Sequence, residues 1–113
     1  MDTASGMAAR QPRAIEELDD AAVVRALKAL ADPTRFRMLE EIARAGELSC
    51  GQVGEHFDMA QPTISHHLKI LGDAGLLQAR SQGKHHFVSV NASAVSAIAA
   101  LLPARLSPAK KTR

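Results

Sequence analysis

The chain has 113 residues, the usual length of one domain, and can bury a modest core without disulfides or metal. Its single cysteine, Cys50, excludes an intramolecular disulfide, and no apolar run approaches the roughly 20 residues needed to span a bilayer. We therefore expect a cytoplasmic protein with no targeting segment and no membrane contact.

Charge is distributed unevenly, although the formal net charge is only +2. Residues 1–58 carry seven Lys or Arg against eleven Asp or Glu, whereas residues 59–113 carry seven against one. This asymmetry suggests that the second half meets a polyanion. Three of those seven basic residues lie in the last four positions, so the charge is supporting evidence only.

The first predicted helix follows an arm without apolar periodicity. Residues 1–13 show no such pattern, and we expect them to be disordered. Beyond them, apolar side chains recur every three or four residues, which predicts an amphipathic helix over residues 15–30. This apolar face comprises Ile15, Leu18, Ala22, Ala26 and Leu30.

The second predicted helix lies in ADPTRFRMLEEIARAG and has clear boundary signals. Asp32 is a suitable N-cap, Pro33 suits the first helical position, and Gly46 suits the exit. Its expected buried side comprises Phe36, Leu39, Ile42 and Ala43.

A short third helix and a fourth helix follow. Ser49 and Gln52 have the spacing of a capping box, and Val53 and Phe57 lie one turn apart. After a four-residue turn, a fourth helix is predicted from Pro62 to about Gly72. Its apolar positions are Ile64, Leu68 and Leu71.

A β-hairpin and a last helix complete the pattern. The β-prone segments 76–80 and 85–90 flank a polar turn that contains Gly83. The last helix is predicted over residues 92–102, with Pro103 ending it and residues 107–113 forming a disordered basic tail. Its apolar stripe comprises Val95, Ile98 and Leu102.

The predicted order, ααααββα, indicates a mainly α protein with a small β-hairpin, an α+β fold. A short helix turning into a second helix is typical of the helix-turn-helix motif, and a hairpin directly after it is typical of a wing. We therefore predict a single winged helix-turn-helix domain over residues 14–106.

The outward side of the fourth helix is the main candidate for function. At about 100° per residue, Pro62, Ser65, His66 and Lys69 point away from the apolar side, whereas His67 lies near the core boundary. The two adjacent histidines therefore do not share a face and cannot jointly hold one ion from a regular helix.

Short donors and acceptors with one cation, near a helix N-terminus, suit a helix that enters the major groove of DNA. An ordinary solvated helix face is the alternative. We expect Gln61, Ser65 and His66 to reach base edges, and Thr63 and Lys69 to hold phosphates. The complete set of DNA-binding candidates is Gln61, Pro62, Thr63, Ser65, His66, Lys69, Arg80, Lys84 and His85.

Four blocks resemble the ArsR/SmtB winged-helix repressors, in order and at the right spacing. They are ALADPTRFRMLEEI, ELSCGQV, QPTISHHLKILGDAGLL and QGKHHFVSVN, and the resemblance covers roughly residues 23–92. It implies a homodimer paired through the first and last helices, a recognition helix at 61–71, wing tips on the backbone of an inverted-repeat operator, and repression relieved by an inducer. Independently, the Ala-rich last helix suits close packing against a partner.

The resemblance also indicates where metal sites would lie, and the expected ligands are missing. Ser49 and Gly51 occupy the positions of the family's Cys-x-Cys pair, with Cys50 between them. The last helix, which supplies His or Glu ligands in other members, contains no His, Asp, Glu or Cys. We expect no metal and no cofactor. Adjacent His85 and His86 alternate faces on a wing strand, where a structural role is the commoner one.

Cys50 remains a candidate sensor of thiol oxidants. A place in the first turn of a helix favours a thiolate, but no second cysteine exists to resolve an oxidised form within the chain. Small apolar packing is the alternative role, and an intersubunit disulfide stays open.

The sequence favours a dimeric DNA-binding repressor with an unidentified inducer. A thiol-responsive repressor using Cys50 and a winged-helix module for protein partners remain alternatives; the polar, basic RSQGKHH segment argues against the latter. A hydrolase using Ser65 and His66 is excluded, since adjacent helical side chains diverge and no acid is placed to orient the histidine. No catalytic residue is expected.

Overall fold

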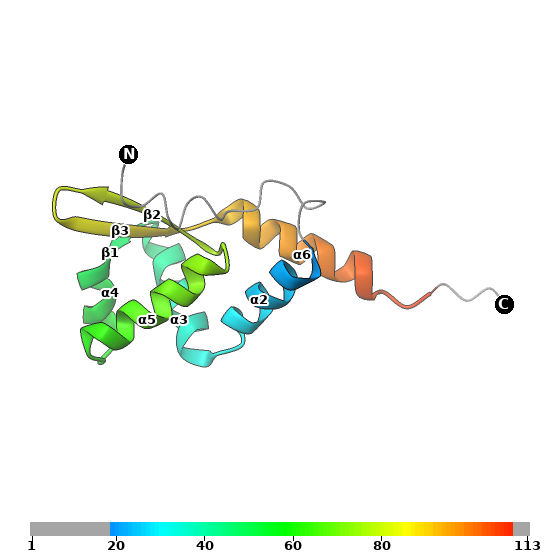
Figure 1. Ribbon diagram of the computed structural model, residues 1–113, viewed down its shortest axis with the longest axis horizontal. Helices are drawn as coiled ribbons and strands as arrows, with labels where there is room; N and C mark the ends of the chain where they lie inside the picture. The colour runs from blue at the N-terminus through cyan, green and yellow to red at the C-terminus, as the bar shows by residue number, and fades with distance from the viewer. Residues whose placement is uncertain (1–18, 110–113) are drawn as a thin grey trace.

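Five helices and three short strands make up the part of the chain that the computed structural model describes, residues 19–109 (Figure 1). In chain order they are α2 (Asp20–Leu30), α3 (Pro33–Ala45), β1 (Leu48–Ser49), α4 (Cys50–His56), α5 (Gln61–Asp73), β2 (Leu77–Gln82), β3 (His85–Val90) and α6 (Ala92–Leu106). This arrangement confirms the predicted winged helix-turn-helix fold. The predicted arm at residues 1–13 lies outside the described residues, as do residues 110–113 of the predicted tail.

The predicted helix boundaries are confirmed where capping residues set them. The carboxylate of Asp32 accepts the backbone N–H of Arg35 at 3.0 Å, Pro33 begins α3, and Gly46 ends it with φ +87°. The capping box is complete, because Gln52 N–H donates to Ser49 Oγ at 3.1 Å and Ser49 N–H donates to Gln52 Oε1 at 2.8 Å.

The wing is part of a three-stranded antiparallel sheet of order β1-β3-β2. Gln82 pairs with His85 across a two-residue turn, in which Gly83 adopts φ +62°. The sequence analysis missed β1, since two residues are too short to show a strand pattern; Leu48 pairs with Val88. This pairing joins the base of the wing to the segment between α3 and α4.

Three predicted apolar faces are partly wrong. On α6, Val95 is 37% exposed and Leu102 is half-buried, so Ile98 is the one residue of the predicted stripe that is buried. On α2, Val23 and Ala29 are buried beside Ala26, whereas Ala22 and Leu30 are only half-buried; Ile15 and Leu18 lie outside the described residues. On α3 the buried side chains are Met38, Leu39 and Ile42, because the core-facing side of α3 is rotated from the predicted one. Phe36 is 50% exposed and Ala43 is exposed.

The predicted stop at Pro103 is also wrong, because α6 continues to Leu106. Proline cannot donate to the carbonyl of Ala99, but Ala99 and Pro103 are both exposed, so water can satisfy that group. The longer helix extends well beyond the body formed by α3, α4 and α5 (Figure 1). Its buried residues are Ala94, Ala97, Ile98 and Leu101.

Asn91 is the one polar side chain among the buried residues of the described part, and it fixes the start of α6. Its Nδ2 donates to the Gly75 carbonyl at 3.0 Å, and its Oδ1 accepts the Ala94 N–H at 3.3 Å. The side chain therefore joins the turn after α5 to the first turn of α6. Among the described residues, no helix is long and apolar enough to cross a membrane.

Candidate nucleic-acid interface

The rotation of α5 is set by its buried residues. Ile64, Leu68 and Leu71 are at most 3% exposed and pack in a core shared with α2, α3, α4 and β2. The opposite side, predicted to point outward, is exposed as expected. It comprises Pro62, Ser65, His66 and Lys69; Gln61 and Thr63, in the first turn, are exposed as well.

The exposed side chains of α5 differ in whether they already form an ion pair or a hydrogen bond within the protein. Lys69 Nζ lies 3.1 Å from the Asp73 carboxylate, one turn along the same helix. Ser65 and His66 have no side-chain hydrogen bond within the described part of the chain, so their polar groups face solvent. The face predicted to reach base edges is thus available to a ligand.

The N-terminus of α5 is suited to an anion. Its N-cap is Ala60, which makes no side-chain capping hydrogen bond, and the first turn contains no acidic residue. Of the first three positions, Pro62 has no N–H and the Thr63 N–H donates to the Ala60 carbonyl at 3.0 Å, so this terminus offers an anion the Gln61 N–H and the positive end of the helix dipole. A phosphate of a DNA backbone is an appropriate partner for such a terminus.

Gly54 allows α4 and α5 to approach closely, a feature that the sequence analysis did not recognise. A Cβ atom at Gly54 would lie 2.5 Å from Nε2 of Gln61. The Gln61 side chain therefore lies over α4 and is less free than the other exposed residues of α5. The sequence signal that could have indicated this close approach is a glycine inside a short helix.

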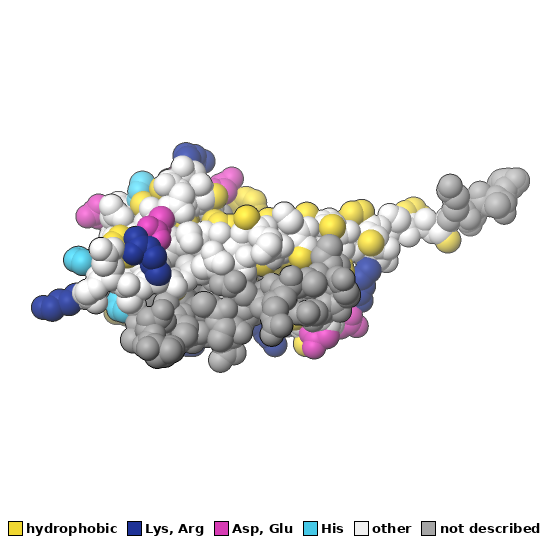
Figure 2. All heavy atoms as spheres, turned by 90° about the horizontal axis from the view of Figure 1, so that it is seen from above, with side chains coloured by type: hydrophobic (Ala, Val, Ile, Leu, Met, Phe, Trp, Pro, Cys, Tyr) yellow, Lys and Arg dark blue, Asp and Glu magenta, His cyan; other side chains and the backbone are white. Residues whose placement is uncertain are grey.

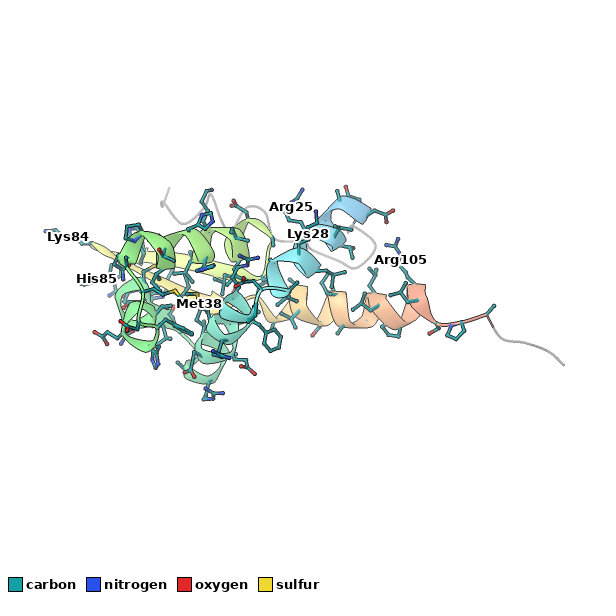
Figure 3. The ribbon with its side chains drawn as sticks, turned by 90° about the horizontal axis from the view of Figure 1, so that it is seen from below. Arg25, Lys28, Met38, Lys84, His85 and Arg105 are labelled. Carbon is teal, nitrogen blue, oxygen red and sulfur yellow. The ribbon has the colours of Figure 1, made fainter. Side chains whose placement is uncertain are left out.

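The wing presents a cation at its tip. Lys84 and His85 lie at one end of the molecule, and both are exposed (Figure 3). Neighbouring His86 has its Nδ1 atom 3.1 Å from Ser81 Oγ across the hairpin. Figure 2 shows histidine, basic and acidic side chains together at this end, and apolar side chains along the part that extends toward the other end.

Arg80, a predicted DNA ligand, is held within the protein. Its guanidinium makes two hydrogen bonds to the Glu47 carboxylate, at 2.7 and 2.8 Å, and lies 4.5 Å from the ring centre of Phe87. These hydrogen bonds hold the pKa of Glu47 below its usual value and raise the pKa of Arg80. Its contact with DNA stays a prediction, but this geometry favours a role in fixing β2 to the segment before β1.

His67 behaves differently from its neighbour His66, as predicted. It is half-buried, and its buried Nδ1 atom has no hydrogen-bond partner among the described residues. It faces the start of α3, where the pKa of Asp32 is lowered chiefly by the Arg35 N–H, with a smaller contribution from the charge of His67. The imidazole therefore packs between α5 and α3 and does not point toward a ligand of the outer face.

Cys50 is half-buried beside a hollow between α4 and the wing tip. Burial raises the pKa of its thiol, so the uncharged form is favoured at neutral pH. This favours the packing role over the reactive one. The hollow is lined by Ser49, Cys50, Gly51, Gln52, Glu55, Lys84, His85 and His86.

No three His, Cys, Asp or Glu side chains of residues 19–109 form a group that could hold a metal ion. His56, the remaining histidine, lies 3.7 Å from the Glu41 carboxylate and connects α4 to α3.

Comparison with known proteins agrees with this geometry. A family model described as a helix-turn-helix domain matches residues 30–78. The transcriptional repressor SdpR of Bacillus subtilis is 38% identical over 64 residues, which cover 57% of this chain and 70% of SdpR. The arsenical resistance operon repressor of Staphylococcus xylosus is 42% identical over 65 residues, 58% of this chain and 62% of that protein.

Solved structures show the same fold. A crystal structure of an ArsR family transcriptional regulator superposes with a TM-score of 0.69 at 26% identity, covering 78% of this chain and 90% of that one. The chain belongs to the ArsR/SmtB family of helix-turn-helix transcriptional regulators. Reduced HlyU from Vibrio cholerae is likewise similar, with a TM-score of 0.61 at 28% identity over 78% of this chain and 92% of that chain. Members of this ArsR/SmtB family are DNA-binding regulators and not enzymes.

The Glu47 ion pair gives a test of the part that Arg80 plays. Because its charge is compensated, we expect Arg80→Ala to reduce the salt dependence of binding to random-sequence duplex less than Lys84→Ala does. Glu47→Gln should instead increase the salt dependence and strengthen DNA binding, because it removes a carboxylate and releases the Arg80 guanidinium. The measurement is DNA affinity across a salt series. Equal reductions for Arg80→Ala and Lys84→Ala would instead assign Arg80 to the phosphate contacts.

Proposed function

We propose that the chain is a homodimeric repressor that binds an inverted-repeat operator and is released by an inducer other than the metal ions typical of the family. The observation that carries the proposal is the outer face of α5. It presents Ser65 and His66 with unengaged polar groups beside an uncapped helix N-terminus. Short donors and acceptors on such a face suit base edges in the major groove.

The proposed contacts divide into two kinds. Ser65 and His66 would contact base edges, whereas Thr63, Lys69 and the wing residues Lys84 and His85 would contact the backbone. Pro62 would pack against the backbone at the entrance of α5, and Gln61, which lies over Gly54, would reach bases only after its side chain turns away from α4.

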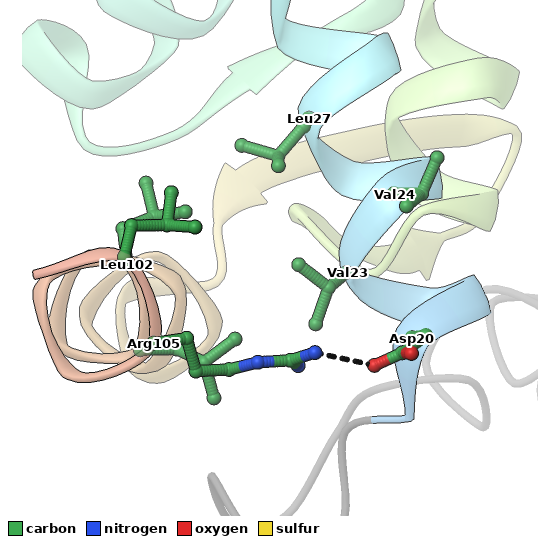
Figure 4. A pocket seen from close by; sticks show the side chains of 8 residues that line it. Asp20, Val23, Val24, Leu27, Leu102 and Arg105 are labelled. Carbon is green, nitrogen blue, oxygen red and sulfur yellow. Dashed lines mark hydrogen bonds and ion pairs between the residues drawn. The ribbon is translucent and has the colours of Figure 1, made fainter. Parts of the chain in front are cut away.

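The proposed dimer face is the groove between α2 and α6 (Figure 4). The Arg105 guanidinium lies 2.6 Å from the Asp20 carboxylate at its edge. Val24 and Leu106 remain 47% and 73% exposed, and burying them against a second copy would remove apolar surface from water. The remaining lining is apolar and comprises Val23, Leu27, Leu101 and Leu102.

The alternatives have weaker support. A module for protein partners would need an apolar wing, but the wing tip exposes Gln82, Lys84 and His85. A thiol-responsive repressor would need a reactive thiolate, and burial raises the pKa of Cys50. The arsenical resistance repressor of S. xylosus is named for a metalloid response, yet the described residues of this chain offer no group of three metal ligands.

The division between base and backbone contacts leads to a first test. Ser65→Ala or His66→Ala should weaken operator binding by roughly 1–3 kcal/mol and leave random-sequence binding nearly intact. Lys84→Ala should weaken both and lower the slope of log affinity against log salt by about one per subunit. Affinities for both duplexes across a salt series provide the measurement.

Ser96→Ala, which changes an exposed serine on α6, is the matched control and should change neither affinity. If Ser65→Ala and His66→Ala left operator preference intact while Lys84→Ala abolished it, α5 would not be the recognition helix.

A second test concerns assembly. We expect light scattering at micromolar concentration to give twice the chain mass of 12.0 kDa. Val24→Glu should shift the protein to monomer, because the dimer would bury an unpaired carboxylate. Ala43→Glu, an exposed position on α3, controls for the added charge. A wild-type monomer would refute the dimer and with it recognition of an inverted repeat.

A third test concerns the inducer. Zinc, cadmium and arsenite should leave the affinity for operator essentially unchanged in buffer without chelating thiols. Cys50→Ser should likewise bind operator as the wild type does in reducing buffer. Stoichiometric binding of any of these ions, accompanied by release of DNA, would show that the histidines or Cys50 form a sensor site.

A further inference from the structure

Two cations on α2 lie outside both the helix-turn-helix motif and the wing. Arg25 and Lys28 are exposed and one helical turn apart. Neither has an ion-pair partner within residues 19–109. Most other basic side chains there are engaged by a carboxylate, namely Arg44, Lys69, Arg80 and Arg105.

The acidic residues of α2 do not compensate these two charges. The Asp19 carboxylate caps the helix by accepting the Ala22 N–H at 2.8 Å. The Asp20 carboxylate is paired with Arg105 at the groove between α2 and α6. Among the described residues, therefore, no carboxylate compensates the positive charge on the outer side of α2.

The position of α2 places this charge beside the proposed DNA-binding face. Its buried side, which includes Val23 and Ala26, packs in the core that α5 shares, and α2 contacts α5. Figure 3 shows Arg25 and Lys28 along the same edge of the molecule as α5, whereas α3, which carries Met38, lies on the opposite side. The helix α2 that carries these two cations contacts α5 and lines a groove with α6, and the ribbon shows it next to both helices (Figure 1).

We propose that Arg25 and Lys28 form an additional binding site for DNA phosphates, separate from α5 and the wing. This inference depends on the proposed function, because it requires that α5 faces DNA. In a dimer paired through α2 and α6, both copies of α2 lie between the two recognition helices. Their cations would then contact the backbone between the half-sites and add affinity without sequence preference.

The test compares Arg25→Ala, Lys28→Ala and the double variant on operator and random-sequence duplexes across a salt series. Removing one cation from a phosphate should lower the slope of log affinity against log salt by about 0.9, so the slope of the double variant should fall by up to about four in a dimer. Both duplexes should be affected alike. Arg25 gives the sharper single test, since Lys28, in the last turn, also interacts with the C-terminal dipole of α2.

Two further variants serve as controls. Arg25→Lys combined with Lys28→Arg keeps both charges and should restore the slope. Arg37→Ala removes another exposed cation that has no ion-pair partner among the described residues, but it lies on α3 and should leave the slope unchanged. Light scattering of each variant checks that the dimer is retained.

An unchanged slope for the double variant, with Lys84→Ala still lowering it, would overturn the additional site and leave the proposed function intact. The additional site would also be overturned if the double variant bound DNA more weakly with an unchanged salt slope. The same holds if its loss of affinity coincided with dissociation of the dimer. Failure of the wild type to bind any duplex would instead refute the proposed function.

Discussion

The burial of one side of α5 is the constraint on which the proposed function depends. Ile64, Leu68 and Leu71 occupy the core and thereby fix the rotation of the helix about its axis. With that rotation fixed, Ser65 and His66 can only point outward, and His67 can only pack toward α3. A polar side chain in place of Ile64 would leave a buried polar group without a partner and destabilise this packing. The orientation of the side chains proposed to contact DNA thus follows from apolar packing on the opposite side of the same helix.

Besides the packing of β2 against α5, a second set of contacts positions the wing. Pairing of β1 with β3 and the ion pair between Arg80 and Glu47 join the wing to the segment between α3 and α4. The wing tip can therefore carry its cation, Lys84, at a defined distance from α5. The proposed dimer face between α2 and α6 is a third region, and α2 contacts α5 as well as lining that groove. Packing of α2 against α5 provides a physical connection between the proposed dimer face and the orientation of α5.

Much of this fold could be predicted from the sequence because its signals are local. The capping residues Asp32, Ser49 and Gln52 set helix starts, and the spacing of Ile64, Leu68 and Leu71 identified the outer face of α5. The remaining features depend on contacts between distant residues. The strand β1 exists only through pairing with β3, and Arg80 is engaged only because Glu47, 33 positions earlier, folds beside it. The buried face of α3, with Met38 inside and Phe36 outside, was likewise decided by tertiary packing.

The central claim is that side chains on the outer face of α5 determine which DNA sequence is bound. It is tested most directly by selecting bound fragments from a random pool with the wild type and with His66→Ala, and by sequencing both sets. The account predicts that the wild type selects an inverted repeat, with half-site centres about one helical turn of DNA apart or a multiple of it. It also predicts that His66→Ala loses base preference at the same position of each half-site. Identical selected sequences from the two proteins, or no shared sequence in the wild-type set, would contradict the claim.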